Sequence, residues 1–333
     1  MALALAFVVG GCTDSLCPLL PGEPFTLVGK NPFAAAQPTP LGQRLHTLEG
    51  WRHELYMGYG DYDENTGPIE VSIYNPRLNT FAGKLRFDTE AIEIYRRIGE
   101  RLYAPAIDPV GSGQSATVAI GEPDGRWWNN KSVFMTHVFD IATLDGTDLW
   151  LAGSRGSNAL VVRSSDGGTS WTTALTLAPI GRHPDDFSRF YFMFAHGGRL
   201  YVQAEDYLGG AQPRSKVLSG VGWIDGPDLQ ALRGSEPKPV AFSNKIVYRG
   251  RESLVVFDGK TVRPARIEAV DLTVSGEALY VLDGRQIRRT RDLENWTDVA
   301  AAPAEATSIG VLDGVLYVGT ARSELYRHCK TLR

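Results

Sequence analysis

Acidic residues alternate along Asp61-Tyr62-Asp63-Glu64-Asn65, a pattern that places several oxygen ligands in one loop. Carboxylate and amide oxygens at alternate positions bind calcium in EF-hand loops. The EF-hand pattern is not met here, because Gly67 stands one place late and Ser72 occupies the position of the closing Glu. Calcium therefore stays an alternative, and no other cofactor is expected. We expect a polar turn or a ligand-contacting loop, with Asp61, Asp63 and Asn65 as candidates.

Two indoles stand beside two amides in Trp127-Trp128-Asn129-Asn130. An aromatic face next to hydrogen-bonding groups suits stacking on a sugar ring. In the alternative interpretation, one indole fills the protein interior and the other is half-buried. We place the pair in a loop spanning 124–136, with Trp127 and Trp128 as candidate glycan contacts.

A histidine precedes two carboxylates in Arg182-His183-Pro184-Asp185-Asp186. A base beside acids could perform general acid–base chemistry on a bound ligand. We expect this loop to face Glu205-Asp206-Tyr207, which makes His183, Asp185, Glu205 and Asp206 candidates. Loops of mixed charge are also often only solvated, and that alternative stays open.

These candidates sit on a repeat architecture. A two-residue phrase, an aliphatic residue followed by an aromatic one, recurs at spacings of 32 to 51 residues: Leu55-Tyr56, Leu102-Tyr103, Leu149-Trp150, Leu200-Tyr201, Val247-Tyr248, Leu279-Tyr280 and Leu316-Tyr317. Periods of roughly 20–50 residues indicate solenoids or propellers. Seven phrases predict seven repeats.

Each repeat reads as four short strands joined by tight turns. In 137–177 the strands are expected at 137–144, 148–153, 158–163 and 171–177, with Asp145-Gly146 as a hairpin turn. Four-stranded antiparallel units repeated radially form an all-β propeller, here with seven blades. The last unit has only three strands, so we expect a strand within Pro24 to Lys30 to complete it. The best helix candidate, Thr89 to Arg97, also suits a strand.

Propeller ligands usually bind where loops between second and third strands meet loops between blades. On this assignment Asp108, Arg155, Arg251 and Arg322 lie in loops of that face. The first three join the candidate ligand contacts, and Arg155, Arg251 and Arg322 could converge on an anionic group.

The run from Ser164 to Trp171 matches Ser/Thr-x-Asp-x-Gly-x-x-Trp at every defined position. Asp166 can accept N–H groups of its own turn, Gly168 supplies a positive φ, and Trp171 fills space between blades. A partial copy occurs at Thr290, Asp292 and Trp296, with Glu294 or Asn295 where Gly is expected. The chain thus resembles the Asp-box (BNR-repeat, sialidase-like) propellers. That resemblance implies a structural role for Ser164, Asp166, Gly168 and Trp171, on the face away from the ligand.

Composition restricts the class of function. The net charge is -4, and no Lys/Arg cluster is present, which argues against a nucleic-acid partner. Hydrophobic residues make up 43% of the chain, enough for a full core.

The N-terminus, Met1 to Cys12, is a short apolar run that resembles the lipobox of bacterial lipoproteins, with Cys12 as the lipidation site. It lacks a basic n-region, so an ordinary apolar N-terminus is the alternative. We divide the chain into a signal-like segment (1–12), a linker (13–23) and one propeller domain (24–333). Export would allow a disulfide between Cys17 and Cys329, with unrelated thiols as the alternative.

The sequence favours a non-catalytic, exported binding or scaffold propeller that recognises a glycan or a protein through its axial loops. It would be a cell-envelope lipoprotein or a secreted protein, with membrane contact only through a lipid anchor, and a monomer or part of a larger assembly. A sialidase-like glycoside hydrolase is one alternative, although its Arg-Ile-Pro signature is absent. A phage tail or host-recognition component is the other.

Overall fold

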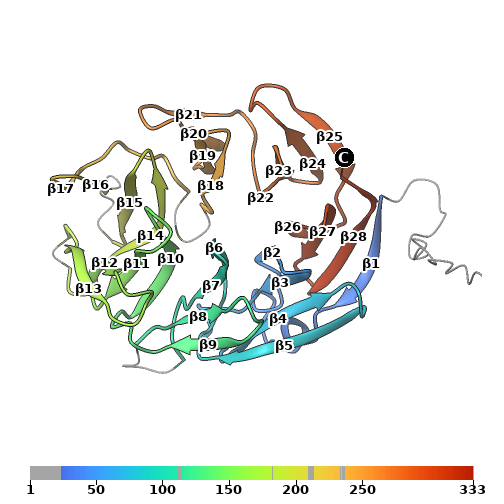
Figure 1. Cartoon of the computed structure of the whole chain (residues 1–333), viewed down its shortest axis with the longest axis horizontal. Coiled ribbons are helices and arrows are strands. Elements are labelled where there is room, and N and C mark those ends of the chain that lie inside the picture. The colour runs from blue at the N-terminus through green and yellow to red at the C-terminus, as the bar shows by residue number, and fades with distance from the viewer. Residues whose placement is uncertain are drawn as a thin grey trace, which may run out of the picture.

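The computed structural model describes residues 24–110, 115–181, 183–208, 214–232, 234 and 237–332. These residues form seven four-stranded antiparallel sheets, arranged around an axis as the blades of a propeller (Figure 1). The predicted fold is confirmed. The segments predicted as signal (1–12) and linker (13–23) lie outside the described residues.

Blades 1 to 6 each consist of four consecutive strands that pair in chain order, the first being innermost. From blade 1 to blade 3 they are β2 (Thr47–Trp51), β3 (Glu54–Gly58), β4 (Ile69–Asn75), β5 (Thr80–Phe87); β6 (Arg96–Ile98), β7 (Arg101–Pro105), β8 (Val118–Gly121), β9 (Trp127–Asn130); β10 (His137–Ala142), β11 (Leu149–Arg155), β12 (Asn158–Ser164), β13 (Thr172–Leu177). From blade 4 to blade 6 they are β14 (Ser188–His196), β15 (Arg199–Asp206), β16 (Arg214–Ser219), β17 (Gly222–Asp225); β18 (Val240–Phe242), β19 (Lys245–Arg249), β20 (Leu254–Phe257), β21 (Val262–Pro264); β22 (Asp271–Ser275), β23 (Ala278–Asp283), β24 (Gln286–Thr290), β25 (Thr297–Ala301).

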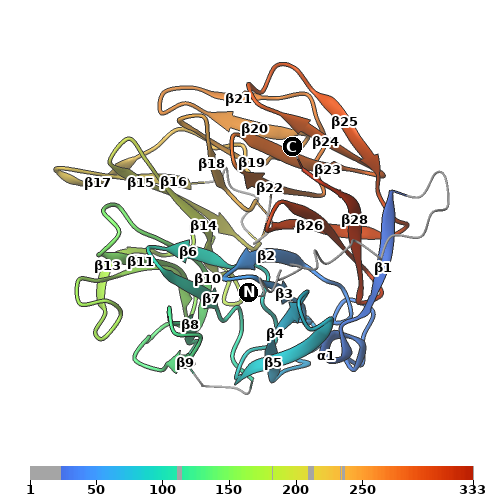
Figure 2. The same ribbon diagram turned by 45° about the vertical axis from the view of Figure 1, so that its right-hand side comes forward.

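Blade 7 joins the two ends of the chain. Its inner strands are β26 (Ala306–Leu312), β27 (Val315–Thr320) and β28 (Glu324–Thr331), and its outermost strand is β1 (Phe25–Lys30) (Figure 2). The β1–β28 register runs from Phe25 opposite His328 to Lys30 opposite Glu324. The predicted closure by an N-terminal strand is confirmed. It pairs an edge of β28 that would otherwise be open to association with another chain.

The repeated aliphatic–aromatic phrase lies on the second strand of every blade, and all fourteen of its side chains are buried. Several of its aromatic rings pack against the following blade, whereas Tyr248 of blade 5 packs against Phe192 and Phe194 of the preceding blade. Trp150 of blade 3 lies 6.2 Å from Trp223 of blade 4, and Tyr201 of blade 4 lies 4.8 Å from Phe257 of blade 5. The phrase therefore supplies both the core of each sheet and the contact between sheets.

Short segments depart from the prediction. Thr89 to Arg97 forms no helix; it is a loop that runs into β6. The helix α1 (Pro32–Ala35) was not predicted. The buried Asn31 side chain caps it by accepting the N–H groups of Phe33 and Ala34 at 3.0 and 3.3 Å. Within the described part of the chain, no helix is long and apolar enough to cross a membrane.

Candidate functional site

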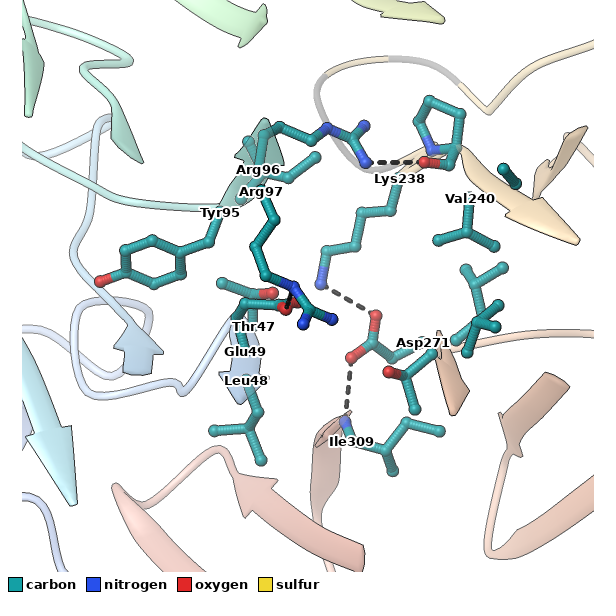
Figure 3. Close-up of a pocket in the computed structure, with 16 residues that line it drawn as sticks. Thr47, Leu48, Glu49, Tyr95, Arg96, Arg97, Lys238, Val240, Asp271 and Ile309 are labelled. Atoms are coloured by element: carbon teal, nitrogen blue, oxygen red, sulfur yellow. Dashed lines mark hydrogen bonds and ion pairs between the residues drawn. The ribbon is translucent and has the colours of Figure 1, made fainter. Parts of the chain in front are cut away.

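The inner strands enclose a cavity of about 380 Å³ on the propeller axis (Figure 3). Its walls come from β2, β6, β18, β22 and β26 and the residues just before them. Charged side chains cross this space. Their pairing decides whether the cavity can accept a ligand.

Asp140 on β10 links three consecutive blades. Its carboxylate accepts two hydrogen bonds from Arg96 of blade 2, at 2.8 and 3.0 Å, and one from the N–H of Met193 in blade 4, at 3.1 Å. The same guanidinium crosses the channel and donates from Nη1 to the Pro239 carbonyl of blade 5 at 2.7 Å. One ion pair thus connects blades 2 to 5.

Asp271 on β22 repeats this arrangement three blades further on. It accepts the Lys238 ammonium from the segment leading into blade 5, at 3.0 Å, and the Ile309 N–H of blade 7, at 2.9 Å. Lys238 also donates to the His46 carbonyl just before blade 1. The second ion pair therefore connects blades 5, 6, 7 and 1.

Glu49 on β2 and Arg97 on β6 complete the ring, with 2.7 Å between their charged atoms. Burial raises the pKa of the Glu49 carboxyl above its ordinary value, and the Arg97 guanidinium opposes that effect. Every blade thereby contributes to one chain of ion pairs and hydrogen bonds around the axis. A charged ligand entering the channel would have to displace these internal partners, so the loops around the channel are better placed to contact a ligand.

The predicted calcium-like loop is a polar turn built around Asp61. The buried Asp61 carboxylate accepts the Thr39 hydroxyl at 2.6 Å and the N–H groups of Asp63 and Glu64 at 3.0 and 3.2 Å. Asp63 and Asn65 are exposed. Among the described residues no group of three or more His, Cys, Asp or Glu is arranged to hold a metal. Asp61 is itself buried because its carboxylate accepts these bonds within the turn, so it is poorly placed to contact a ligand.

Glu90, which the sequence did not single out, lies between the loops that carry Asp61 and Asp108. Its N–H donates to the Asp108 carbonyl at 2.9 Å, and its carbonyl accepts the Asp61 N–H at 3.0 Å. The side chain is fully buried, and neither carboxyl oxygen has a hydrogen-bond partner in the structure. Burial, followed by the charges of Asp108 and Asp61, raises the pKa of Glu90 to about 7.

Asp108 lies beside His137, at the beginning of β10. The Nε2 atom of His137 is 3.2 Å from an Asp108 carboxylate oxygen and 3.2 Å from Nη2 of Arg189, and its Nδ1 is 2.7 Å from the Ser154 hydroxyl. Nε2 can donate to Asp108 only when it carries a proton and can accept from Arg189 only when it does not. Four blades therefore meet through Glu90, Asp108, His137 and Arg189.

An apolar surface lies next to Arg189 on the axial loops of blade 4. Phe187 and Tyr207 stack with 4.5 Å between ring centroids, and the Arg189 guanidinium lies 4.3 Å from the Phe187 centroid. Ile180, Tyr207 and Leu208 are 58%, 63% and 49% exposed. We call Ile180, Phe187, Tyr207 and Leu208 the blade 4 patch.

The two loops predicted to face each other at blade 4 do so. The Tyr207 N–H donates to the Phe187 carbonyl at 2.9 Å, and the Leu208 N–H donates to buried Asp186 at 3.1 Å. His183 and Asp185 are exposed and 3.6 Å apart. Asp206 is buried against Arg214 at 2.8 Å, and Glu205 lies opposite Arg189 across β14 and β15. The exposed His–Asp pair matches a solvated loop.

The three arginines expected on the axial face lie in separate blades. Arg251 pairs with Asp228 at 3.3 Å, and Arg322 donates to Glu305 at 2.8 Å. Arg155 instead lies over the Phe134 ring, 5.5 Å from its centroid. Two of the three thus have carboxylate partners of their own, which leaves them poorly placed to share one anionic ligand.

The placement of Trp127 and Trp128 in an axial loop is wrong. Both lie on β9, the outer strand of blade 2. Trp127 packs between blades 1 and 2, with its ring 5.4 Å from that of Tyr56, while Trp128 is half-exposed and donates to Glu122 at 2.9 Å. Strand pairing with β8 turns successive indoles to opposite faces, so the pair cannot form one stacking platform. The structure matches the alternative interpretation.

The motif from Ser164 to Trp171 lies in the hairpin between β12 and β13, as predicted. Asp166 accepts the Ser164 hydroxyl at 2.7 Å and the Ser170 N–H and hydroxyl at 2.9 and 2.6 Å, and these bonds lower the pKa of its carboxyl to about 2. Gly168 has φ +95° and its carbonyl accepts from Asn130 of blade 2 at 2.6 Å. This hairpin is at the face opposite the axial loops, because third strands end there.

The partial copy is similarly built around Asp292. It accepts the Thr290 hydroxyl and the N–H groups of Glu294 and Asn295 at 3.1, 2.9 and 2.8 Å. The positive φ falls on Leu293, at 69°, and not on Glu294 or Asn295 as expected.

Cys12 and Cys17 lie outside the described residues, so lipidation and the Cys17–Cys329 bridge stay predictions.

Comparisons with known proteins agree with this architecture. No protein-family model matches the chain. The photosystem II assembly lipoprotein Ycf48 of Synechococcus sp. (strain CC9902) is 25% identical over 190 residues, which cover 52% of this chain and 54% of that protein. The chain thus spans about half the length of this curated relative.

Solved propellers superpose on most of the chain. A structure of YCF48 bound to D1 peptide has a TM-score of 0.54 at 10% identity and covers 96% of this chain and 99% of its own. A chain of the mitotic checkpoint complex has a TM-score of 0.58 at 10% identity, with coverage of 98% and 99%. At such identities these likenesses establish the fold alone.

The residues that sequence reasoning missed are Glu90, His137, Ser154 and Arg189. Each lies at the beginning or end of a strand, or in a loop, where no repeated motif marks it. The position of Arg189 directly after Phe187-Ser188 is visible in the sequence, but its contact with His137 of the preceding blade is not.

Proposed function

We propose that this chain is a non-catalytic, exported binding propeller that recognises a segment of a protein partner through the blade 4 patch. The observation that carries the proposal is the distribution of exposed apolar side chains. Among the described residues, the large hydrophobic side chains exposed in axial-face loops are Ile180, Tyr207 and Leu208. Ile180 lies in the loop that leads into β14 of blade 4, and Tyr207 and Leu208 lie in the loop after β15. Exposed apolar groups gathered beside polar ones mark interaction sites on soluble proteins.

The chemistry of the patch favours a peptide segment that carries an apolar side chain next to a carboxylate. Stacked Phe187 and Tyr207 offer a flat apolar surface, and Arg189 holds its guanidinium against one edge. Arg189 forms no ion pair with a carboxylate among the described residues, although Glu205 is its cross-strand neighbour. Aromatic residues and arginine are the side chains that contribute most to protein–protein binding energy.

Glycan recognition and a sialidase-like activity receive less support than recognition of a protein. Recognition of a glycan rested on Trp127 and Trp128, which lie on an outer strand. A sialidase-like activity would need arginines free to grip a carboxylate, and Arg251 and Arg322 are already paired. The Asp-box geometry at Ser164 to Trp171 supports membership of the Asp-box propellers, which we propose on that motif alone.

The partial likeness to Ycf48, a lipoprotein, supports the export part of the proposal. A solved structure of similar fold, YCF48, is bound to a D1 peptide, which makes peptides the first ligands to test. For this chain a peptide partner and a lipid anchor at Cys12 are proposals.

Selection from a random peptide phage library tests the proposal. We expect enriched peptides with an aromatic or aliphatic residue beside an acidic one. Their binding, measured by calorimetry, should be weakened at least about tenfold by Tyr207→Ser or Arg189→Gln, as removal of a central interface residue does. Val221→Ser, on the opposite face, is the matched control and should leave affinity unchanged. Enriched peptides that bind the Tyr207 and Arg189 variants as tightly as the unaltered protein, or strong signals on a glycan array only, would refute it.

A further inference from the structure

We propose that Glu90 is a proton-dependent latch that holds together the axial loops of blades 1 and 2. In its neutral form the side chain stays buried beneath both loops. In its ionised form it leaves that position and loosens them. This device requires no partner and is independent of the proposed function.

The backbone of Glu90 joins the two loops directly. The Asp61 N–H binds its carbonyl and its own N–H binds the Asp108 carbonyl, at 3.0 and 2.9 Å. The adjacent residues extend this contact, since Ala91 pairs with Gly60 and the Ile92 N–H donates to Tyr59 at 3.0 Å. Displacement of Glu90 would therefore break hydrogen bonds to both blades at once.

The side chain of Glu90 has no counter-charge. Its two oxygens are buried without hydrogen-bond partners, and the groups that act on it by charge, Asp108 and Asp61, are both acids. A buried carboxylate without a partner is strongly disfavoured, and a like charge nearby disfavours it further. Only the protonated form suits this environment, and its pKa of about 7 places the transition near neutral pH.

Other ionisable groups surround the latch without neutralising it. The Asp61 carboxylate is held in position by the Thr39 hydroxyl and by the N–H groups of its own turn. Asp108 lies beside His137, whose Nε2 atom also contacts Arg189, and neither of these two side chains forms a hydrogen bond with the Glu90 carboxyl group. His46 lies beneath the blade 1 loop, with its ring 2.9 Å from the Gly60 carbonyl, and Asp88 and Glu93 lie on the same loop as Glu90.

Displacement of Glu90 would affect the apolar residues that lie beneath the axial loops. Ala91, next to Glu90, packs with Ile107 and Phe139 in a small apolar cluster, against which Tyr62 and Tyr191 lie. Phe139 also stacks on His137 at 5.7 Å. Release of Glu90 would loosen this cluster from the side of blades 1 and 2 and leave the opposite face of the molecule unchanged.

Hydrogen exchange of the full chain at pH 6 and pH 8, corrected for the intrinsic effect of pH, tests the latch. The ionised fraction of a group with a pKa of about 7 rises about tenfold over this range, so peptides containing Asp61 and Glu90 should exchange about tenfold faster at pH 8. Peptides from the Asp-box hairpin should not change. Glu90→Gln, which stays neutral, should abolish the difference, whereas Glu64→Gln, at an exposed acid in the Asp61 loop, should preserve it.

A difference that persists in Glu90→Gln would assign the effect to another group and overturn the proposal, as would its absence from the unaltered protein. Should Glu90→Gln fail to fold, a carbon-13 NMR titration of the unaltered chain decides. A Glu90 carboxyl midpoint within one unit of pH 7 is expected, and a midpoint near the ordinary value of 4.5 would refute the latch.

Discussion

Arg96 and Asp140 form a two-point ion pair inside the channel, with Nε to Oδ1 at 2.8 Å and Nη2 to Oδ2 at 3.0 Å. Both side chains are largely buried, and each also binds the backbone of another blade. The pair therefore fixes the relative positions of four blades. The same arrangement of Lys238 and Asp271 three blades later makes this a repeated feature of the ring.

Asp140→Ala should lower the free energy of unfolding by about 3–5 kcal/mol, because it leaves the Arg96 charge and the Met193 N–H buried without a partner. Guanidinium chloride unfolding measures this. Replacement of both partners by apolar residues, Arg96→Met with Asp140→Leu, should cost less than Asp140→Ala alone. Equal losses in the single and double variants would show that the pair itself, and not the orphaned charge, is decisive.

Trp171→Ala should destabilise the fold by about 3–5 kcal/mol, as large-to-small changes at buried aromatic residues do. Trp128→Ala is a matched control, since this half-exposed indole should contribute about 1 kcal/mol or less. Thermal unfolding of both variants makes the comparison. Peptide binding at the blade 4 patch should survive Trp171→Ala below the melting temperature, because the Asp-box lies on the opposite face; loss of binding with an unchanged melting temperature would mean that the two faces have been exchanged.

Acid should weaken the Asp-box hairpin. The pKa of Asp166 is about 2 in the folded chain, below its ordinary value of 3.8, so the stability it provides is complete above about pH 4 and is lost as pH falls to about 2. Melting temperatures between pH 2 and pH 5 should therefore fall less steeply in Asp166→Asn than in the unaltered protein. Asp185→Asn, at an exposed position, should leave the slope unchanged.

Glu90 should have the opposite effect on the pH dependence of stability, because its contribution is lost as pH rises. Its pKa in the folded chain is raised from the ordinary 4.5 to about 7, so the folded state holds a proton that the unfolded state releases. The stability associated with this proton is present below about pH 4.5 and declines as pH rises to about 7. Unfolding titrations from pH 4.5 to pH 8 should show this decline in the unaltered protein and not in Glu90→Gln; a rise in stability that depends on Glu90 would contradict the assignment.

If the proposal of export holds, Cys17 and Cys329 should form a disulfide. The Cys329 N–H donates to the Pro24 carbonyl at 3.0 Å, so the chain segment that leads back to Cys17 begins beside Cys329. A bridge that closes so long a loop adds roughly 4–5 kcal/mol in the chain-entropy model. Peptide mass mapping without reductant should recover the linked pair, and alkylation of both thiols in the intact protein would exclude it.

The sequence alone determined the fold because the signals for it are local and repeated. Leu200 and Tyr201 sit in one second strand and Leu279 and Tyr280 in another for the same reason: each phrase buries two side chains in the core. The turn from Ser164 to Trp171 could also be predicted from sequence, since Ser164 and Ser170 both donate to Asp166 within a single hairpin. Three strands in the last unit were enough to require the N-terminal strand β1.

Only the tertiary structure decided which side chains meet on the axial face. Glu90 is buried because loops of two different blades contact it. Arg96 pairs with Asp140, 44 residues away in the sequence, because the packing of adjacent blades brings the two side chains together. Conversely, the sequence predicted that Trp127 and Trp128 form one ligand contact. In the structure both lie on β9, where successive side chains point to opposite faces of the sheet. Local residue types specify strands and turns, whereas burial and charge depend on how seven sheets are placed around one axis, which no short stretch of sequence encodes.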